Sequence, residues 1–436
     1  MNHSFFRDII SKNDEGSVFL SVSYSKLFTL MENYNLTSAD LMRQANISGN
    51  IISRLRHNEY VSLETVENIC KVLKCRANDV LEFYFQSDSE CKKAKELSPV
   101  LEIQNRRYLG NKFKLLDFIV EVVQENCSKI ETVADIFSGT GAVTSAFTEK
   151  TIITNDLLYS NYLCNLAWFG SGSLRIHFLS SLIREYNQNE NFEENYMTKN
   201  FADTYFSKVD CSKIGFIRED IEQKYKVGTI SERERAFLIA SLIYAMDKIA
   251  NTCGHYDAWR RGVMFERHLV LPVLNVPTKN NKSNRCFNED ANELVRHIKA
   301  DLIYIDPPYN SRQYSDTYHL LENVARWEKP PVYGVALKPN RKNLKSDYCT
   351  QKAAEAFEDL IKNCKAKYIL FSYNNMAQKG NDRSNARISD EDIFRILNSK
   401  GSVKVFSKKY KAFTTGKSNI LGNEERLFLC KVSEEK

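Results

Sequence analysis

The sequence lacks an uninterrupted apolar run of 18 or more residues, the length that a membrane-spanning helix needs. Its first residues, Met-Asn-His-Ser-Phe-Phe-Arg, also lack the basic segment followed by an apolar segment that is typical of a signal peptide. Both absences argue against secretion and membrane insertion. We therefore expect a cytoplasmic protein without a membrane partner.

A cysteine framework is missing as well. The chain contains 11 cysteines, but they form no paired C-x-x-C motifs and no regular spacing. Disulfide scaffolds and structural zinc sites are recognised by such spacing. The pattern therefore predicts reduced, mostly buried thiols and no metal site.

A strong excess of charge of one sign is also absent. The net charge is +6 and the isoelectric point is about 8.6, which is compatible with a nucleic-acid partner without requiring one. The chain does have length, at 436 residues, and 43% apolar residues. These values predict a sizeable core and more than one domain.

The most informative segment is Asp301–Tyr309, where an apolar run ends in an acid, two prolines and an aromatic ring. Leu302 to Ile305 is typical of a buried parallel strand. Because Pro307 and Pro308 cannot continue a β-ladder, the strand must end there. In open α/β sheets ligands bind at the carboxyl ends of strands, so this segment predicts a binding site.

Asp306, Pro307, Pro308 and Tyr309 are the candidate catalytic residues. Proline fixes φ and has no N–H, so the Asp306 carboxylate and the Pro307 carbonyl form a stiff pair of acceptors. Such a pair suits an exocyclic amino group, which offers two donors. The Tyr309 ring could stack on a base extruded from a nucleic acid. The alternative is an Asp-Pro turn with a surface tyrosine.

Two upstream segments predict a nucleotide-like ligand. Thr132–Gly141 is an apolar run that ends in an acid and a turn in which Gly139 and Gly141 permit close backbone approach. Thr151–Asp156 is a β-branched run that ends in a second acid, about 20 residues beyond the first, where nucleotide-binding folds place a carboxylate on ribose hydroxyls. The combination is more specific than either segment.

The order of these motifs resembles that of class I S-adenosylmethionine-dependent methyltransferases, and within them the Dam-type (D12 class) adenine-specific DNA methyltransferases. The resemblance covers residues from about 100 to 436. The segments that carry it are Arg107–Lys112, Asp135–Gly141, Asp156, Asn288–Ala291, Asp306–Tyr309 and Phe371–Asn375.

The resemblance implies a doubly wound, Rossmann-like α/β methyltransferase domain that transfers a methyl group from S-adenosyl-L-methionine to N6 of an adenine in double-stranded DNA. It also implies a restriction-modification system, with a cognate restriction endonuclease acting on the same site as a candidate partner. No metal is implied. The implied cofactor-binding residues are Tyr108, Gly110, Lys112, Asp135, Phe137, Gly139, Gly141, Asp156, Asp290 and Asp306.

Two alternatives stay open at this point. Pro-Pro-Tyr motifs serve any exocyclic amine, so an RNA or cytosine-N4 methyltransferase is the nearest one. The family associates an acid at position 306 with adenine in DNA, and Ser or Asn there with the alternatives. The second alternative is a DNA-binding regulator with a cofactor-sensing methyltransferase-like domain.

The first 90 residues predict a small helical DNA-binding domain. Helices are expected from Leu27 and over Thr37–Ala45, Ile47–Arg56, Val61–Cys70 and Ala77–Phe83. The tight joint between the second and third resembles the Cro/repressor-type helix-turn-helix family. The resemblance implies that the second motif helix enters the major groove. The DNA-facing residues would be Ser48, Asn50, Ser53, Arg54 and Arg56. A helical bundle for dimerisation or for contacts to the catalytic domain is the alternative.

A linker is expected over residues 91–99, followed by the methyltransferase domain over 100–436. Within it, residues 165–285 form an insertion that the cofactor fold does not need, which we expect to recognise the target. It contains an apolar helix over Phe237–Ala250. The oligomeric state stays open.

Aromatic and basic side chains on either side of the catalytic motif are the candidate DNA contacts, because they combine stacking faces with guanidinium groups. They are His255, Tyr256, Arg260, Arg261, Arg312 and Tyr314. The alternative is that the aromatics pack in the core and the arginines are solvated. His319 is either part of this group or a core histidine. Lys338–Lys345 and Lys400–Lys417 could line a phosphate-binding face, although lysines also protect edge strands.

Overall fold

The computed structural model describes residues 19–34, 36–57, 59–86, 100–103, 106, 108–190, 193–277, 283–374, 387–409 and 424–433. The chain divides into two compact units, Met1–Leu97 and Ser98–Lys436, and each is described by itself. The predicted linker, 91–99, lies outside the described residues. No described helix is long and apolar enough to cross a membrane.

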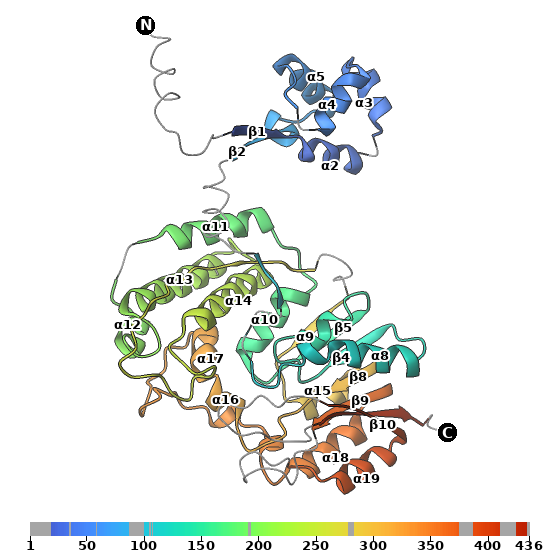
Figure 1. The fold of residues 1–436 in the computed structure, drawn as a ribbon, viewed down its shortest axis with the longest axis vertical. Coiled ribbons are helices and arrows are strands. Elements are labelled where there is room, and N and C mark those ends of the chain that lie inside the picture. Colours follow the sequence, from blue (N-terminus) through green and yellow to red (C-terminus); the bar gives the residue numbers. More distant parts are fainter. Residues whose placement is uncertain are drawn as a thin grey trace. The chain divides into compact units, whose positions relative to one another are not determined.

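The N-terminal unit is a small helical bundle with a two-stranded sheet (Figure 1). Leu27, Leu41, Leu55 and Ile69 come from four different helices and are fully buried in its core. Strands β1 and β2 pair antiparallel. The elements are β1 (Phe19–Ser23), α2 (Ser25–Asn33), α3 (Ser38–Ala45), α4 (Gly49–Arg56), α5 (Leu63–Leu73), α6 (Ala77–Val80) and β2 (Glu82–Gln86).

The predicted pair of short helices with a tight joint is confirmed by α3 and α4. Thr37 and Ser48 cap them, each accepting a backbone N–H of the first turn. Between them Asn46 takes a left-handed conformation (φ 51°), which reverses the chain. The predicted last helix is too long: α6 ends at Val80, because Glu82–Gln86 pairs with β1 instead.

The second unit is built on a seven-stranded sheet with the order β10-β11-β9-β8-β4-β5-β7. Strands β7, β5, β4, β8 and β9 are parallel, and β11 runs antiparallel to both β9 and β10. The bounds are β4 (Thr132–Asp135), β5 (Thr151–Asn155), β7 (Arg285–Phe287), β8 (Ala300–Ile305), β9 (Ala366–Asn374), β10 (Gly401–Lys409) and β11 (Glu424–Val432).

Helices cover both faces of this sheet, as the doubly wound prediction requires. Successive side chains of β8 face opposite sides of the sheet, and both sides are apolar. Leu302 and Tyr304 pack in the cluster of Ile119 on α8, whereas Ile303 and Ile305 pack in the cluster of α15, α18 and α19. The bounds are α8 (Leu116–Asn126), α9 (Ala142–Ser145), α15 (Ala291–His297), α18 (Ala353–Asn363) and α19 (Asp390–Asn398).

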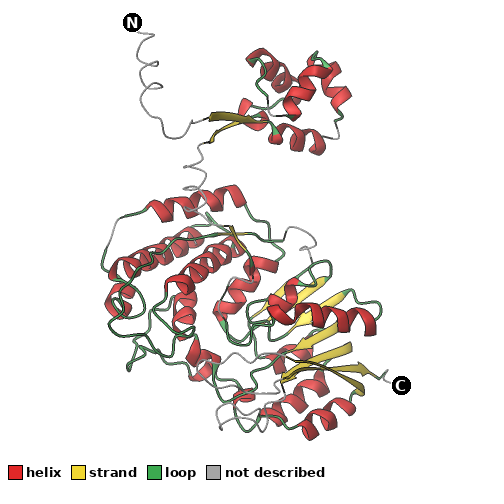
Figure 2. Cartoon of the chain, viewed as in Figure 1, coloured by secondary structure: helices red, strands yellow, loops and turns green. Residues whose placement is uncertain are grey.

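A helical layer forms the rest of the unit (Figure 2). The predicted apolar helix is confirmed, since every residue of α14 from Ala236 to Met246 is buried. The elements are α10 (Tyr159–Phe169), α11 (Ile176–Gln188), α12 (Tyr196–Phe201), α13 (Lys208–Lys226), α14 (Glu232–Ile249), α16 (Tyr314–Thr317) and α17 (His319–Arg326), the parallel pair β3 (Val100–Leu101) and β6 (Val273–Leu274), and the 3₁₀ turns η2 (Phe113–Leu115), η3 (Lys342–Leu344) and η4 (Asp347–Cys349).

The two lysine-rich segments have different places. Residues 401–409 form β10, the outer strand of the sheet, which agrees with the edge-strand alternative; the remainder, up to Lys417, lies outside the described residues. In the other segment, Lys338 forms an ion pair with Asp257 and Arg341 pairs with Asp316. These two cations are therefore partly neutralised by acids of the same unit.

Candidate active site

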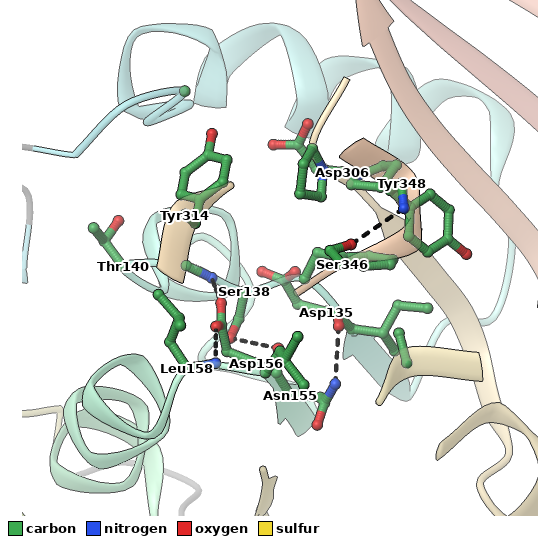
Figure 3. Close-up of a pocket in the computed structure, with 18 of the residues that line it drawn as sticks. Asp135, Ser138, Thr140, Asn155, Asp156, Leu158, Asp306, Tyr314, Ser346 and Tyr348 are labelled. Atoms are coloured by element: carbon green, nitrogen blue, oxygen red, sulfur yellow. Dashed lines mark hydrogen bonds between the residues drawn. The ribbon is translucent and has the colours of Figure 1, made fainter. Parts of the chain in front are cut away.

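Three acids gather where the strand order reverses. The chain adds β5 and β7 on one side of β4 and then β8 and β9 on the other side, and ligand sites form at such switch points. Asp135 ends β4, and Asp156 and Asp306 directly follow β5 and β8. All three line one pocket with about 1000 Å³ of empty space, including solvent at its mouth (Figure 3). We call it the strand-end pocket.

A glycine turn forms one wall of this pocket. Gly139 has φ 51°, and a Cβ added to it would lie 3.1 Å from Cε1 of Tyr108, so the tyrosine ring rests on the glycine. The Gly139 N–H donates to Oδ2 of Asp156 (2.9 Å). Gly110 is equally constrained, because its added Cβ would lie 3.1 Å from the Tyr314 hydroxyl. Both glycines are needed for close approach of backbone and rings.

Gly141 requires a correction. It was predicted to contact the cofactor, but it is absent from the pocket lining, and a Cβ added to it would lie 2.7 Å from both Asn165 Oδ1 and Phe169 Cε2. Its φ is 79°. The glycine therefore allows α10 to pack against the start of α9, behind the pocket wall.

Burial raises the pKa of both acids at the ends of β4 and β5. The pKa of Asp156 rises to about 6, against the opposing effect of N–H donors that include Gly139 and Leu158 (2.8 Å to Oδ1). The pKa of Asp135 rises to about 7; its Oδ2 accepts from Thr144 Oγ1 (2.8 Å). Oδ1 of Asp135 has no hydrogen-bond partner among the described residues. This buried acceptor can bind a donor from a ligand.

The acid of the catalytic motif is paired. Nζ of Lys112, a buried residue, lies 3.0 Å from Oδ1 of Asp306 and 3.2 Å from Oε1 of Glu425. Burial disfavours the ammonium, but the two carboxylates hold the pKa of Lys112 well above its ordinary value. Burial raises the pKa of Asp306 to about 6, and Lys112 acts in the opposite direction. Above about pH 6 the site therefore holds a lysine cation between two carboxylates.

Tyr309, at the end of the motif, makes two contacts with later segments of the chain. The Tyr309 ring meets the Tyr373 ring edge to face, with centroids 6.2 Å apart, and the Tyr309 carbonyl accepts the Arg387 N–H (3.0 Å). Asp306, Pro307, Pro308 and Tyr309 all line the strand-end pocket. The acid and the tyrosine therefore border the same space.

Tyr314 belongs to a cluster of tyrosines in the pocket wall. Its ring centroid lies 5.3 Å from that of Tyr108, which stacks on Tyr318 at 4.7 Å. The Tyr314 hydroxyl donates to the Leu109 carbonyl (3.1 Å), and the Leu109 N–H donates to the Tyr318 hydroxyl (2.7 Å). The cluster links the segment before α8 to the segment after β8.

Phe137 and Asp290 also line the strand-end pocket. Phe137 packs edge to face on Tyr348, with centroids 5.1 Å apart, and Asp290 Oδ1 accepts the Asn292 N–H (2.8 Å) at the start of α15. Sequence reasoning missed Asn155, whose amide bonds to both backbone groups of Glu289; its position beside Asp156 was an available signal. It also missed Ser346, Tyr348 and Glu425, which no motif marks.

The other predicted DNA contacts lie outside the strand-end pocket. Tyr256 is wrong as a DNA contact: the residue is 2% exposed, and its hydroxyl donates to Asp247 Oδ1 (2.8 Å). His255 is half-buried 3.7 Å from Asp257, and burial lowers its pKa. Arg260, Arg261 and Arg312 are exposed. His319 is 1% exposed and lies outside the strand-end pocket.

The predicted groove-facing residues of α4 differ in availability. Asn50 and Ser53 are exposed, and Ser48 caps the helix by accepting the Ile51 N–H (3.4 Å). Arg54 instead bonds the Tyr60 carbonyl and pairs with Glu59, and Arg56 donates to Ser38 Oγ (3.0 Å). Both arginines are therefore engaged within the N-terminal unit, which weakens their prediction as free DNA contacts.

Comparisons with known proteins agree with this geometry. The family model for D12 class N6 adenine-specific DNA methyltransferases matches residues 108–381, and the model for the Cro/C1-type HTH DNA-binding domain matches residues 26–86. The chain belongs to the D12 class N6 adenine-specific DNA methyltransferase family and carries a Cro/C1-type helix-turn-helix domain. The predicted family and fold class are confirmed.

The chain is similar to three curated proteins. Modification methylase LlaI of Lactococcus lactis subsp. lactis is 32% identical, over 74% of this chain and 53% of that protein. Modification methylase StsI of Streptococcus sanguinis is 37% identical, over 67% and 46%. Type II methyltransferase M.CviAII of Paramecium bursaria Chlorella virus 1 is 29% identical, over 75% and 98%. The chain spans about half the length of LlaI and StsI.

Proposed function

We propose that this protein transfers a methyl group from S-adenosyl-L-methionine to N6 of an adenine extruded from double-stranded DNA. The observation that carries the proposal is the shared pocket of the Asp306 motif, at the end of β8, and the Gly139 turn, after β4. Family membership supports adenine as the target. A cytoplasmic location follows from the proposal, because the substrate is cellular DNA.

The residues of the strand-end pocket fit the cofactor. Gly139 permits close approach, Asp156 offers carboxylate acceptors at the end of the second strand, and Asp135 presents an unpartnered buried oxygen. These three residues would hold the cofactor with Tyr108 and Gly110 as neighbouring walls. S-adenosyl-L-methionine supplies an electrophilic methyl group when bound. The protein's contribution is to position donor and base, which lowers the barrier through proximity and orientation.

Asp306 and the Pro307 carbonyl would accept the two hydrogens of the adenine amino group, and Tyr309 would stack on the ring. Lys112 keeps Asp306 ionised, so both Asp306 oxygens act as acceptors. This grip orients the nitrogen lone pair. The amino proton becomes acidic only after methyl transfer, when Asp306, with its pKa of about 6, is a suitable acceptor.

Replacing Asp306 tests the proposal directly. Asp306→Ala should abolish formation of N6-methyladenine, because the adenine amino group loses the carboxylate that orients it. Cofactor affinity measured by calorimetry should stay within a few-fold. Asp301→Asn, at the opposite end of the same strand, is the matched control and should keep turnover. Near-normal methylation by Asp306→Ala would refute the mechanism, and methylation of cytosine or RNA by the unaltered protein would refute the substrate.

A restriction-modification context is the finer proposal, with a cognate restriction endonuclease acting on the same site. The names of the relatives, modification methylases and Type II methyltransferases, support it. Sequencing of native DNA from a host that expresses the protein should detect N6-methyladenine in one sequence context. Methylation without any sequence context would contradict this part.

DNA contacts are proposed at two places. In the second unit, Arg260, Arg261 and Arg312 are exposed cations within the insertion of 165–285 or directly after the catalytic motif. In the first unit, Asn50 and Ser53 are exposed on α4, the second helix of the motif. The insertion would serve target recognition, and the first unit would bind DNA through the major groove.

A further inference from the structure

A second pocket lies beside the strand-end pocket. It has about 440 Å³ of empty space, including solvent at its mouth, and shares Ser315 and Leu344 with the first. Its lining includes His319 and Asn323 of α17. We call it the side pocket. Nothing in the proposed mechanism uses it.

Three buried polar atoms of this pocket have no hydrogen-bond partner among the described residues: Ser315 Oγ, His319 Nδ1 and Asn323 Oδ1. The three residues are 2%, 1% and 4% exposed. Buried polar groups without a partner are uncommon and costly. All three residues line the side pocket, so a polar ligand bound there can satisfy them.

The hydrogen-bond polarity of His319 is determined by its protein contact. Nε2 lies 2.8 Å from the Tyr256 carbonyl, which can only accept, so Nε2 carries the proton. Burial lowers the pKa of His319 to about 4, so the ring is neutral near pH 7. Nδ1 is therefore an acceptor.

The polarity of Asn323 follows in the same way. The Tyr196 hydroxyl donates to the Pro330 carbonyl (2.7 Å), which can only accept. Tyr196 must then accept from Asn323, and it does so from Nδ2 (2.8 Å). Oδ1 of Asn323 is left as an acceptor for the pocket.

The side pocket thus presents two fixed acceptors and one hydroxyl, so its ligand must be a hydrogen-bond donor. The lining also holds two arginines, Arg326 and Arg341, and two glutamates, Glu322 and Glu328, so its charges balance. Arg326 pairs with Glu322, and Arg341 pairs with Asp316. A neutral amino group is the donor that keeps this balance.

We propose that the side pocket binds the exocyclic amino group of a second nucleobase of the DNA, other than the target adenine, and so determines part of the sequence specificity. The inference rests on the proposed function, because it takes the DNA bound at the strand-end pocket as the source of the base. A site built to bond an amino group discriminates strongly against a base that lacks it.

Two variants test this in the full-length protein. Ser315→Ala removes an unpartnered hydroxyl. His319→Gln removes the Nδ1 acceptor, and the glutamine amide can still donate to the Tyr256 carbonyl. Ser160→Ala is the matched control, because its hydroxyl is also buried and unpartnered but lies outside both pockets. Thermal unfolding checks that each variant folds.

The measurement is kcat/KM on duplexes in which one amino group at a time is deleted, with inosine for guanine, purine for adenine or 2-pyrimidinone for cytosine, at every position except the target. For the unaltered protein, one deletion should lower kcat/KM about tenfold, which corresponds to about 1.4 kcal/mol. In Ser315→Ala and in His319→Gln, the same deletion should lower kcat/KM by less than twofold relative to the intact duplex. In Ser160→Ala the deletion should lower kcat/KM as much as in the unaltered protein.

Failure of this inference is distinguishable from failure of the proposed function. If the unaltered protein methylates no adenine, the proposed function is wrong. If it methylates adenine but no deleted amino group couples to either variant, the side pocket holds water only and the inference is overturned.

Discussion

At the scale of single residues, the notable feature is the charge group of Lys112, Asp306 and Glu425. The lysine comes from the segment before α8, one carboxylate follows β8 and the other lies on β11. Removing one member of such a buried group is destabilising, because it leaves an uncompensated charge. The ionisation of Asp306 therefore depends on both neighbours.

The pH dependence of methylation should report this dependence. Because the pKa of Asp306 is about 6 and the ionised form grips the base, kcat/KM should fall as the pH drops through about 6. Lys112→Met removes the charge that lowers this pKa, so the fall should move to higher pH. Glu425→Gln removes a charge that raises it, so the fall should move to lower pH. Values of kcat/KM measured from pH 5 to 9 give both shifts.

The opposite signs provide the internal control. Shifts of both variants in the same direction, or no shift in either, would show that another group limits the rate at low pH. Cofactor affinity measured over the same range separates an effect on the cofactor from an effect on the base.

At the scale of elements, the two glycines after β4 serve different contacts, although they are only two residues apart. Gly139 faces Tyr108 in the strand-end pocket, whereas Gly141 faces Asn165 and Phe169 of α10. Both have positive φ. A glycine motif in a sequence predicts the turn, but the packing of the neighbouring helices decides what each glycine contacts.

Alanine at each glycine should therefore have different consequences. Gly139→Ala should weaken S-adenosyl-L-methionine binding about tenfold or more, because the added Cβ displaces Tyr108. Gly141→Ala should mainly lower the melting temperature, because the added Cβ overlaps buried atoms of α10. Calorimetry and thermal unfolding of both variants measure the two effects.

Gly228→Ala is the control for backbone strain. Its φ is 74° with nothing within 4 Å of an added Cβ, so it should cost only the left-handed conformation, about 1 kcal/mol. Equal behaviour of Gly139→Ala and Gly141→Ala in both measurements would contradict the assignment of separate roles.

At the scale of the whole molecule, the chain joins two compact units with different cores. The residues of the strand-end pocket all come from the second unit. The exposed residues of α4 belong to the first. Binding of DNA by the first unit and methylation by the second are therefore expected to be separable by substitution.

Asn50→Glu combined with Ser53→Glu should lower the affinity of the full chain for the DNA bound by the first unit by at least tenfold, because two acids would face phosphates. Both side chains are exposed, so the melting temperature should not change. The methylation rate on a short duplex at saturation should also stay the same. Footprinting and methylation of the same preparation measure the two activities.

Lys71→Glu, on α5, is the control for charge. It changes the net charge by the same amount as the α4 double variant, but outside α4, and should reduce the footprint less than that variant does. If the α4 variant keeps its footprint but loses methylation specificity, the first unit instead supports the methyltransferase.

Local pattern was enough to predict the strand ends and the helix pair. Leu302–Ile305, followed by Asp306 and two prolines, and the β-branched run before Asp156 predict strands that end at the strand-end pocket, because alternation, β-branching and proline act within a few residues. The capped helices at Thr37 and Ser48 follow from equally local contacts.

Only the tertiary structure decided which of these residues are available and what they face. Tyr256 is buried and bonds to Asp247, Arg54 pairs with Glu59, and Gly141 packs against α10. The tertiary structure also brought Glu425 to Lys112, and left acceptors of Ser315, His319 and Asn323 unpartnered in one pocket. The physical reason is that burial and pairing depend on side chains far apart along the chain, whose meeting no local pattern encodes.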